Sequence, residues 1–347
     1  MASLVLAQPL IPAVAAMRAG AARDFLNQQL HHSPWHGLTK ADVTFAVFVM
    51  LLGMMIPVSL RRHRSDGNWR SALYWKIFRR AALLFAMGVL YNGGFSRPWP
   101  EIRLAGVLQR LAVCYLICAL IFVSVNKWIR YGLVPLILLG YWGVMALVPV
   151  PGRAAGDFSF DGNLAAWVDS RFLPGQALYG TWDPNGILTT IPAIASCLIG
   201  SMWADLLLSG MSSKEKLVWL VVGGLAAINL GVLWDLSFPI NKNLWTSSYV
   251  VVTSGIGTLE LAACYLIADI LDLSRWLFPF IVIGRNLLAA YLIAGMIPLN
   301  MIVDRLVGGD VAAYFGAGAP LLAGLAEGAL LWGILYWLYR HKIFIRI

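Results

Sequence analysis

The sequence predicts an all-α fold, a polytopic transmembrane helical bundle, and two observations carry this prediction. Hydrophobic residues make up 60% of the 347 residues, charged residues only 12%, and the mean hydropathy is +0.74. A soluble domain carries about 25% charged residues. In addition, apolar runs of about 20 residues, the length that crosses a bilayer as a helix, recur along the chain. The composition and the runs together indicate a membrane protein.

The apolar runs define about nine full spans plus a partial one at the N-terminus. Residues 2–17 are apolar but short, and no Lys or Arg precedes them, so a partial first helix fits better than a signal peptide. The full spans are expected near residues 41–60, 72–92, 105–125, 129–148, 186–208, 216–235, 247–270, 276–298 and 318–339. We predict one transmembrane domain over residues 1–347.

The positive charges indicate the orientation of the spans. The net charge of +9 would suggest nucleic acid as the partner of a soluble protein, but here the cations gather in short connections between apolar runs, so no nucleic-acid partner is expected. Arg61-Arg62-His63-Arg64 follows the first full span, which places this connection in the cytoplasm. Alternation from there puts the C-terminus in the cytoplasm and the stretch His31–Asp42 at the outer face.

The connection at about 149–185 is expected to be an extracytoplasmic loop insertion. It is rich in Gly, Pro and Asp, and long structured loops commonly serve binding. Its polar and aromatic residues suit a sugar-like ligand, whereas a solvated turn is the alternative for each single acid. The polar residues are Asp157, Asp161, Asn163, Asp169, Asp183 and Asn185.

The stretch His31–Asp42 holds three of the five histidines of the chain and one acid, directly before an apolar run. Histidine titrates near neutral pH, so such a cluster indicates proton transfer, acyl transfer or metal binding. The alternative is an interfacial loop in which Trp35 lies among the lipid headgroups and the histidines are merely solvated.

Two further patterns limit the chemistry. The four cysteines all lie within apolar runs and form no Cys-x-x-Cys pair, so neither a disulfide framework nor a zinc cluster is indicated. Lys76, Arg79 and Arg80 form a basic cluster at the expected inner face. They suit the phosphates of a cytoplasmic cofactor, or else act as a topology signal that contacts lipid phosphates.

Several short motifs, taken together, resemble the membrane-bound heparan-α-glucosaminide N-acetyltransferase family and its bacterial relatives. They occur in order from about residue 30 to the end of the chain. The family's opening signature, Asp-x-x-Arg-Gly on a first helix, is not found in this sequence. The matching motifs are His32-Ser33-Pro34-Trp35-His36-Gly37-Leu38-Thr39, Gly106-Val107-Leu108-Gln109-Arg110-Leu111, Asp183-Pro184-Asn185-Gly186-Ile187-Leu188, Pro239–Tyr249, Asn286 and Tyr339-Arg340-His341-Lys342.

The resemblance implies an acyltransferase-like protein of the bacterial inner membrane. It would take acetyl-CoA from the cytoplasm and pass the acetyl group to the amine of a glucosamine-type sugar on the outer side. His32 matches the family's catalytic histidine, whereas His36 stands where the animal enzymes have asparagine. His32 would act as general base or as an acetylated nucleophile, oriented by Asp42 or Asp183.

The remaining candidate residues come from the same motifs and from the basic cluster. Candidates for substrate binding are Asp183, Asn185, Lys242, Asn243 and Trp245, and candidates for acetyl-CoA binding are Lys76, Arg79, Arg80, Arg110 and Asn286. No metal is expected. The expected partners are the amino-sugar or glycan substrate and the lipid bilayer, with a homodimer left open.

Three alternative functions remain at this point. A transporter of amino sugars or glycans would also carry polar groups inside its spans and a long outer loop. A metal-dependent membrane hydrolase would use His31, His32, His36 and Asp42, although adjacent histidines point in different directions on any regular element. An O-acetyltransferase of envelope glycans needs the same base catalysis as an N-acetyltransferase.

Overall fold

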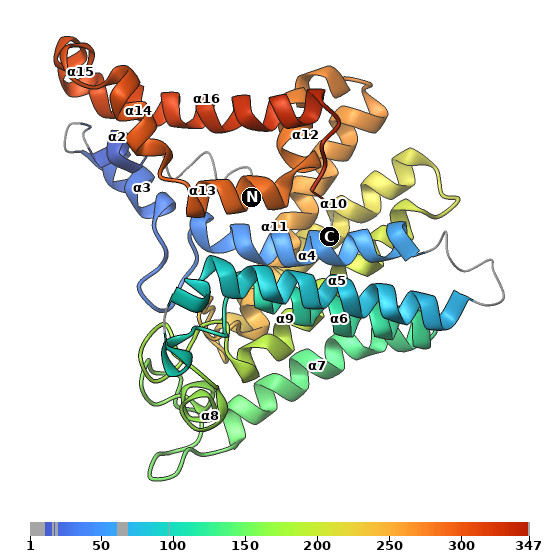
Figure 1. Cartoon of the computed structure of the whole chain (residues 1–347). Coiled ribbons are helices and arrows are strands. Elements are labelled where there is room, and N and C mark those ends of the chain that lie inside the picture. Colours follow the sequence, from blue (N-terminus) through green and yellow to red (C-terminus); the bar gives the residue numbers. More distant parts are fainter. Residues whose placement is uncertain (1–10, 16, 18–19, 61–68, 97, 346–347) are drawn as a thin grey trace. The chain divides into compact units, whose positions relative to one another are not determined.

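The computed structural model describes residues 11–15, 17, 20–60, 69–96 and 98–345. These residues form helices and loops, with two isolated β-bridges and no strand among them. The run Arg61-Arg62-His63-Arg64 and most of residues 2–17 lie outside the described residues. The predicted all-α class is confirmed (Figure 1).

The chain folds into two compact units, which are described separately. Unit 1 comprises residues 1–33, 39–45 and 267–347, and unit 2 comprises residues 34–38 and 46–266. The histidine stretch is therefore divided, because His31, His32 and Asp42 belong to unit 1 and His36 to unit 2.

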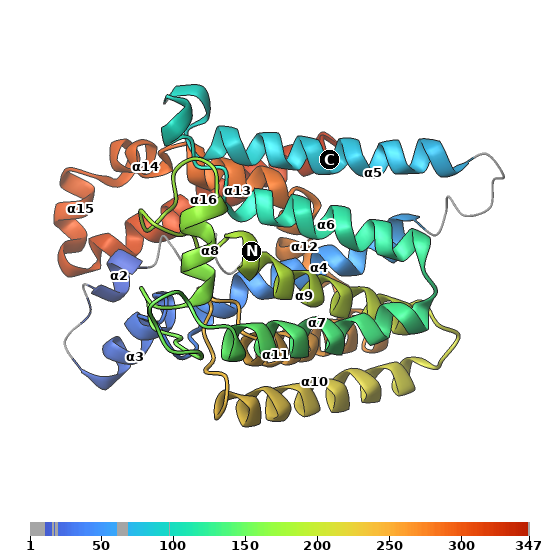
Figure 2. The same cartoon turned by 90° about the horizontal axis from the view of Figure 1, so that it is seen from below.

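Unit 2 contains most of the long helices, and their axes run roughly parallel in Figure 2. Neighbouring helices approach closely at glycines. A Cβ on Gly53 would lie 1.8 Å from the carbonyl oxygen of Cys197, and a Cβ on Gly200 would lie 1.8 Å from that of Met50. Small residues at such crossings are typical of membrane helices. The helices are α4 (Lys40–Leu60, here from residue 46), α5 (Trp69–Tyr91), α6 (Val107–Ser124), α7 (Lys127–Leu147), α8 (Leu164–Phe172), α9 (Ile187–Leu207), α10 (Ser213–Asp235) and α11 (Ser247–Tyr265), with the short turns η3 (Gly94–Ser96) and η4 (Trp99–Glu101).

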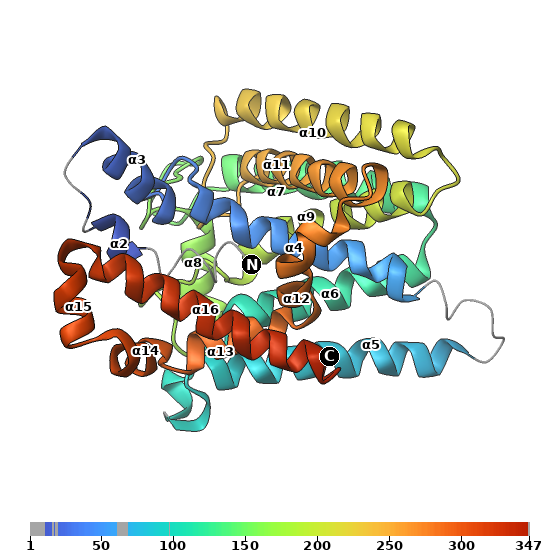
Figure 3. The same ribbon diagram turned by 90° about the horizontal axis from the view of Figure 1, so that it is seen from above.

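Unit 1 is built around the long helix α16, which packs against α2, α12, α14 and α15 (Figure 3). Its buried core joins α12, α13, α14 and α16 through Val282, Ile283, Ala289, Ala290, Leu299, Leu331 and Leu335. Its elements are α2 (Ile11–Ala15), α3 (Ala21–Leu30), the first turns of α4, η5 (Leu266–Ile270, from residue 267), η6 (Ser274–Leu277), α12 (Phe278–Arg285), α13 (Leu287–Met296), α14 (Leu299–Val307), α15 (Asp310–Phe315), η7 (Gly316–Gly318) and α16 (Ala319–Arg340).

Seven helices in the described part of the chain are long and apolar enough to cross a membrane. An eighth span is counted if the pair 274–285 and 287–296, bent by 65°, is one broken span. The expected count of nine is thus not reproduced. The expected span 72–92 corresponds to α5. This helix is long enough to cross a membrane but is not sufficiently apolar, because Lys76, Arg79 and Arg80 place three cations within it. The chain is nevertheless a multi-pass membrane protein.

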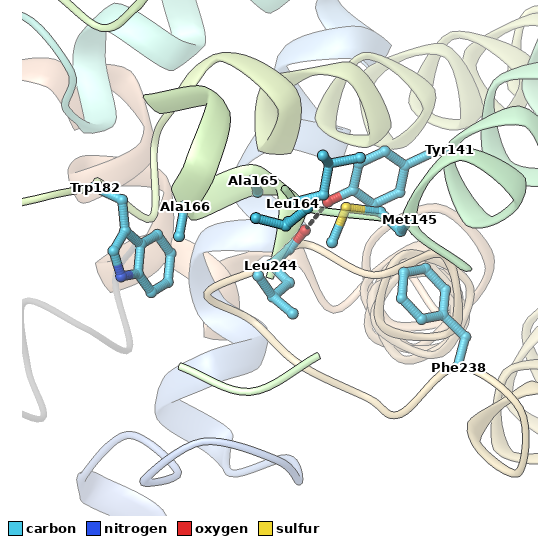
Figure 4. Close-up of a cluster of buried hydrophobic side chains, with 9 residues drawn as sticks. Tyr141, Met145, Leu164, Ala165, Ala166, Trp182, Phe238 and Leu244 are labelled. Carbon is cyan, nitrogen blue, oxygen red and sulfur yellow. Dashed lines mark hydrogen bonds between the residues drawn. The ribbon is translucent and has the colours of Figure 1, made fainter. Parts of the chain in front are cut away.

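The connection between α7 and α9 is an ordered structure rather than a loose loop. Asn163 caps α8 by accepting a hydrogen bond from the backbone of Ala166, at 2.8 Å. Tyr141 of α7 donates a hydrogen bond to the carbonyl oxygen of Leu244 at 2.6 Å, and both side chains belong to the buried cluster shown in Figure 4. That cluster joins the connection to α7 and to the segment before α11. The outer location of this connection and the single domain stay predictions.

Candidate functional site

The stretch around His32 is held by the N-terminus of α4. Thr39 precedes the helix, and Asp42 lies three residues further, the spacing of a capping box. The Asp42 carboxylate accepts a hydrogen bond from the Thr39 backbone at 3.1 Å, and the Thr39 hydroxyl lies 3.4 Å from the Asp42 backbone nitrogen. Because the first turn of a helix favours negative charge, this is a stable position for a buried carboxylate.

Asp42 in turn orients His32. The side chain of Asp42 is 1% exposed, and its Oδ1 lies 2.9 Å from Nδ1 of His32. Its Oδ2 accepts a hydrogen bond from the backbone of Ser33 at 3.1 Å. The carboxylate is therefore fixed on one side by backbone donors of its own loop and faces the imidazole on the other.

This arrangement can perform base catalysis. A carboxylate beside Nδ1 favours the tautomer that carries its proton there, which leaves Nε2 of His32 as the proton acceptor. The His32 side chain is 56% exposed, so the ring is open to solvent or ligand. Unit 1 thus combines a buried orienting acid with an accessible base, which is the minimal equipment for activating an amine or a hydroxyl.

The other two histidines of the stretch have different partners. His31 Nδ1 lies 2.8 Å from the carbonyl oxygen of Asn27 in α3. In unit 2, His36 Nδ1 lies 3.5 Å from the Asn241 amide, and burial lowers the pKa of His36 while Asp235 partly opposes this shift. No group of three or more His, Cys, Asp or Glu residues in the described part of the chain is arranged to hold a metal ion. The ligand set of the hydrolase alternative is therefore not assembled.

Trp35 does not lie free among lipid headgroups. Its indole nitrogen donates a hydrogen bond to the carbonyl oxygen of Phe158 at 2.9 Å, and its ring meets Phe160 and Trp182 edge-on. The backbone of Gly37, with φ 112°, donates to the carbonyl oxygen of Ile240 at 2.9 Å. The middle of the histidine stretch is thus packed into unit 2.

Asp183, a candidate for substrate binding, is fully buried and paired with Arg103. The guanidinium donates from Nε to Oδ2 at 2.7 Å and from its terminal nitrogen to Oδ1 at 3.0 Å. The backbones of Leu178 and Asn185 donate to the same carboxylate at 3.0 and 2.8 Å. Since all these donors come from the chain itself, Asp183 organises the loop before α9, and a ligand would have to displace one of them.

A second buried acid in this loop, Asp169 of α8, prepares the start of α9. It accepts hydrogen bonds from the backbones of Asp183 and Ile187 at 3.2 and 2.9 Å. A Cβ on Gly186 would lie 1.8 Å from the carboxylate, so only glycine fits there. Burial raises the pKa of Asp169, and the two backbone hydrogen bonds act in the opposite direction. The side chain of Asn185 is half-buried beside this network.

Arg110 and Trp245 form a buried stack in unit 2 rather than part of a basic surface. The Arg110 guanidinium lies 4.6 Å from the centre of the Trp245 ring and donates to the carbonyl oxygen of Pro184 and to the Thr189 hydroxyl. Trp245 is 1% exposed and donates to the Ser196 hydroxyl at 3.2 Å. The contacts therefore place Trp245 in the core of unit 2, and it is not available as a stacking surface for a sugar.

The loop before α11 carries the substrate-binding candidates Lys242, Asn243 and Trp245, and it is ordered by the neighbouring residues Asn241 and Thr246. The Asn241 side chain accepts from the Leu244 backbone at 2.9 Å, and the Asn241 backbone donates to the Thr246 hydroxyl at 3.0 Å. These bonds fix Trp245 at φ 51°, an uncommon conformation for a bulky residue. Lys242 and Asn243 are half-buried in the same loop, and they remain candidates for binding.

The residues predicted to bind acetyl-CoA have different surroundings in the two units. Lys76 and Arg79 are exposed on α5, and Arg80 packs with its guanidinium 4.8 Å from the centre of the Tyr115 ring. Arg110 belongs to α6, next to Gln109. Gln109 contacts the far end of α5, because a Cβ on Gly88 would lie 2.4 Å from the Gln109 side chain. About 12 Å of helix separates residue 88 from Arg80.

Asn286 has a structural role within unit 1. Its amide donates to the carbonyl oxygen of Ile343 at 2.9 Å and accepts from the backbone of Ile345 at 3.0 Å. It therefore fastens the C-terminal tail to the break between α12 and α13. Helical spacing alone could predict that the cations of α5 share a face, but not which partners Arg110 and Asn286 have.

Sequence reasoning missed several residues that organise the site. Thr39 had a readable signal, because Thr-x-x-Asp before an apolar run indicates a capping box. Asn241 lies within the motif Pro239–Tyr249 but was not singled out there. Arg103 and Thr189 had no comparable signal, since their partners are distant in sequence.

Comparison with known proteins places these features in a family context. No protein-family model matches the chain. The chain is 29% identical to the human heparan-alpha-glucosaminide N-acetyltransferase over an alignment of 318 residues, which covers 75% of the chain and 48% of the relative. It is 27% identical to the Mus musculus protein of the same name over 321 residues, with the same coverage. The chain spans about half the length of these curated relatives. The comparisons thus bear out the resemblance to heparan-alpha-glucosaminide N-acetyltransferases that the motifs predict.

Proposed function

We propose that this chain is a membrane acetyltransferase in which His32 acts as general base. The observation that carries the proposal is the 2.9 Å contact between His32 Nδ1 and the buried carboxylate of Asp42. The similarity to proteins named N-acetyltransferases supports acetyl transfer as the reaction and a glucosamine-type amine as the acceptor.

The proposed step is direct transfer. Nε2 of His32 takes a proton from the acceptor amine as its nitrogen attacks the thioester carbonyl of acetyl-CoA. The carbon–nitrogen bond forms, the carbon–sulfur bond breaks, and the thiolate of coenzyme A leaves and is protonated. Asp42 stabilises the imidazolium that forms, because its carboxylate remains hydrogen-bonded to Nδ1. An acetyl-imidazole intermediate is the two-step variant of the same chemistry.

We assign the ligands to the more accessible of the candidate residues. Lys76, Arg79 and Arg80 are proposed for the phosphates of acetyl-CoA, and Asn185, Lys242 and Asn243 for the sugar. We assign Asp183, Trp245, Arg110 and Asn286 to positioning, because their side chains are almost fully buried.

The proposed setting follows the orientation that the charges indicate. Acetyl-CoA enters from the cytoplasm of a bacterial cell, and the acceptor binds at the outer face of the inner membrane beside the His32 stretch. The C-terminus, after α16, lies in the cytoplasm. This arrangement requires the acetyl group to cross between two compartments.

The test is acetyl transfer by the purified full-length chain in detergent micelles. Acetyl-CoA is supplied with a panel of amino sugars and sugar alcohols, and acetylated products are measured by mass spectrometry. We expect N-acetylated amino sugar from the native chain and a loss of about 100-fold or more in His32→Ala, the contribution typical of a general base. His31→Ala is the matched control and retains the rate.

Four results would each remove or change the proposal. A native rate in His32→Ala would exclude the base, and acetylation of alcohols alone would indicate an O-acetyltransferase. Uptake of amino sugar into liposomes that contain the chain, without consumption of acetyl-CoA, would indicate a transporter. Labelled acetyl that stays on the protein when no acceptor is present would select the two-step route.

A further inference from the structure

A large cavity lies in unit 2, and none of the residues assigned above lines it. It has a volume of about 1210 Å³ and is lined by the last residues of α6, the start of α7, the end of α9 and the start of α10. Ligand pockets in proteins commonly measure about 300–1,000 Å³. Its size therefore suits a ligand larger than a typical small molecule. The polar residues of its wall are Asn126, Lys127, Arg130, Tyr131, Asp205 and Ser209.

A second cavity of about 520 Å³ adjoins the first. The two share Val134, Ile199 and Trp203 as wall residues. The second cavity lies among α7, α9, α10 and α11, and apart from Ser254 and Thr258 its wall is apolar. The two adjacent cavities thus offer a polar wall, the mouth, at one end of the helices and an apolar wall beside it, which suits an amphipathic molecule.

The mouth contains two buried hydrogen-bond donors without a partner. Arg130 is 3% exposed, and its terminal nitrogen pairs with Asp205, yet its Nε has no partner among the described residues. The indole nitrogen of Trp203 is buried and unpartnered in the same way. A buried donor without an acceptor is costly. Since both groups only donate, the complementary ligand group must be an acceptor.

The position of Trp203 depends on a glycine of the neighbouring helix. A Cβ on Gly223 of α10 would lie 2.4 Å from the Trp203 ring. The missing side chain therefore makes room for the indole on the wall that both cavities share.

The charges of the mouth indicate which acceptor fits. Lys127 and Arg130 carry two positive charges against the single negative charge of Asp205, so the mouth has a net charge of +1. Trp128 and Trp219 stand on the wall with 70% and 56% of their surface exposed, as is typical of tryptophans at the level of lipid headgroups. Basic pockets between membrane helices bind acidic lipid headgroups.

We propose that an anionic phospholipid of the bilayer binds across these two adjacent cavities. Its phosphate would accept hydrogen bonds from Nε of Arg130 and from the indole of Trp203, and one acyl chain would fill the apolar cavity. This proposal is independent of the acetyltransferase function.

The test is native mass spectrometry of the full chain, released from nanodiscs that contain equal amounts of phosphatidylglycerol and phosphatidylcholine. The native chain should retain one phosphatidylglycerol in preference to phosphatidylcholine. Trp203→Phe keeps the ring and removes the donor, and it should reduce retention about tenfold, the effect of one hydrogen bond to a charged group. Trp182→Phe is the matched control, because its buried indole nitrogen is also unpartnered but lies in the cluster of Figure 4.

Two further variants protect the test against a folding defect. Lys127→Gln changes an exposed residue at the mouth and should weaken the preference for phosphatidylglycerol. Ala227→Phe narrows the apolar cavity and should abolish retention of either lipid. Equal retention of the two lipids by the native chain, or native retention in both Trp203→Phe and Ala227→Phe, would overturn the proposal.

Discussion

Two buried aspartates, Asp42 in unit 1 and Asp183 in unit 2, show how similar carboxylates acquire different roles. Both are almost fully buried, at 1% and 0% exposure, and both accept hydrogen bonds from the backbone of their own loop. They differ in the side chain that they face. Asp183 meets a guanidinium that is permanently charged, whereas Asp42 meets an imidazole that can gain and lose a proton. The first pair fixes a loop, and the second pair is suited to chemistry.

The largest expected effect distinguishes the two carboxylates by activity. Asp42→Asn should lower kcat for acetyl transfer by about 10²–10⁴, because an amide no longer selects the His32 tautomer or stabilises its charged form. Steady-state rates of the purified variant measure this effect. Asp157→Asn, on a partly exposed loop carboxylate, is the control, and equal rates in the two variants would refute the distinction.

The second prediction concerns stability rather than rate. Arg103→Met removes the cation from the buried Asp183 carboxylate and should cost about 3 kcal/mol or more of unfolding free energy. Thermal unfolding in detergent measures the loss. Arg153→Met breaks the more exposed pair with Asp157 and should cost at most about 1 kcal/mol. A similar cost in both would mean that Asp183 does not depend on Arg103.

A smaller effect tests whether the helix cap of α4 also serves the site. Thr39→Ala should cost about 1 kcal/mol of stability and lower the transfer rate severalfold. The reason is that the Asp42 carboxylate loses the hydrogen bond that the Thr39 hydroxyl donates to it. Ser212→Ala removes the matching cap of the Ser212–Glu215 box on α10 and should cost the same stability without loss of rate. If Thr39→Ala and Ser212→Ala transferred acetyl at equal rates, the cap of α4 would have no role in catalysis.

The smallest effect is a pH dependence of stability at His36. Burial lowers its pKa below the ordinary value of 6.5, so the unfolded chain binds more protons just below that pH. Stability should therefore fall as the pH drops through 6.5 toward the lower folded-state pKa. The unfolding temperature of His36→Gln should depend less on pH between 7.5 and 5.5 than that of the native chain or of His31→Gln. If the unfolding temperature of His36→Gln depended on pH as strongly as that of the native chain, the lowered pKa of His36 would be contradicted.

The comparison also shows what the sequence alone could predict. Most spans follow from local composition, whereas α5 departs because its cations reduce its apolar character, and the expected span 276–298 is a pair of helices bent by 65°. The proximity of His32 and Asp42 is local as well, because ten residues and one helix cap connect them. These features depend on short-range rules.

The rest depends on contacts across the fold. Arg103 meets Asp183 from 80 positions away, and Arg110 meets Thr189 from 79 positions away. A motif that builds the fold and a motif that binds a ligand have the same appearance in a single sequence. For that reason Asp183, Trp245, Arg110 and Asn286 were predicted as ligand-binding residues, whereas their contacts lie within the chain.

The most direct test of the central claim is the tautomer of His32 in the native chain. Nitrogen NMR of protein labelled at histidine, with the His32 signal identified by its loss in His32→Gln, reports which ring nitrogen carries the proton. Our account predicts that the neutral form of the ring carries its proton on Nδ1, and that Asp42→Asn shows a mixture of tautomers. A proton on Nε2 in the native chain would contradict the account, because that nitrogen would then be unable to accept one from the substrate.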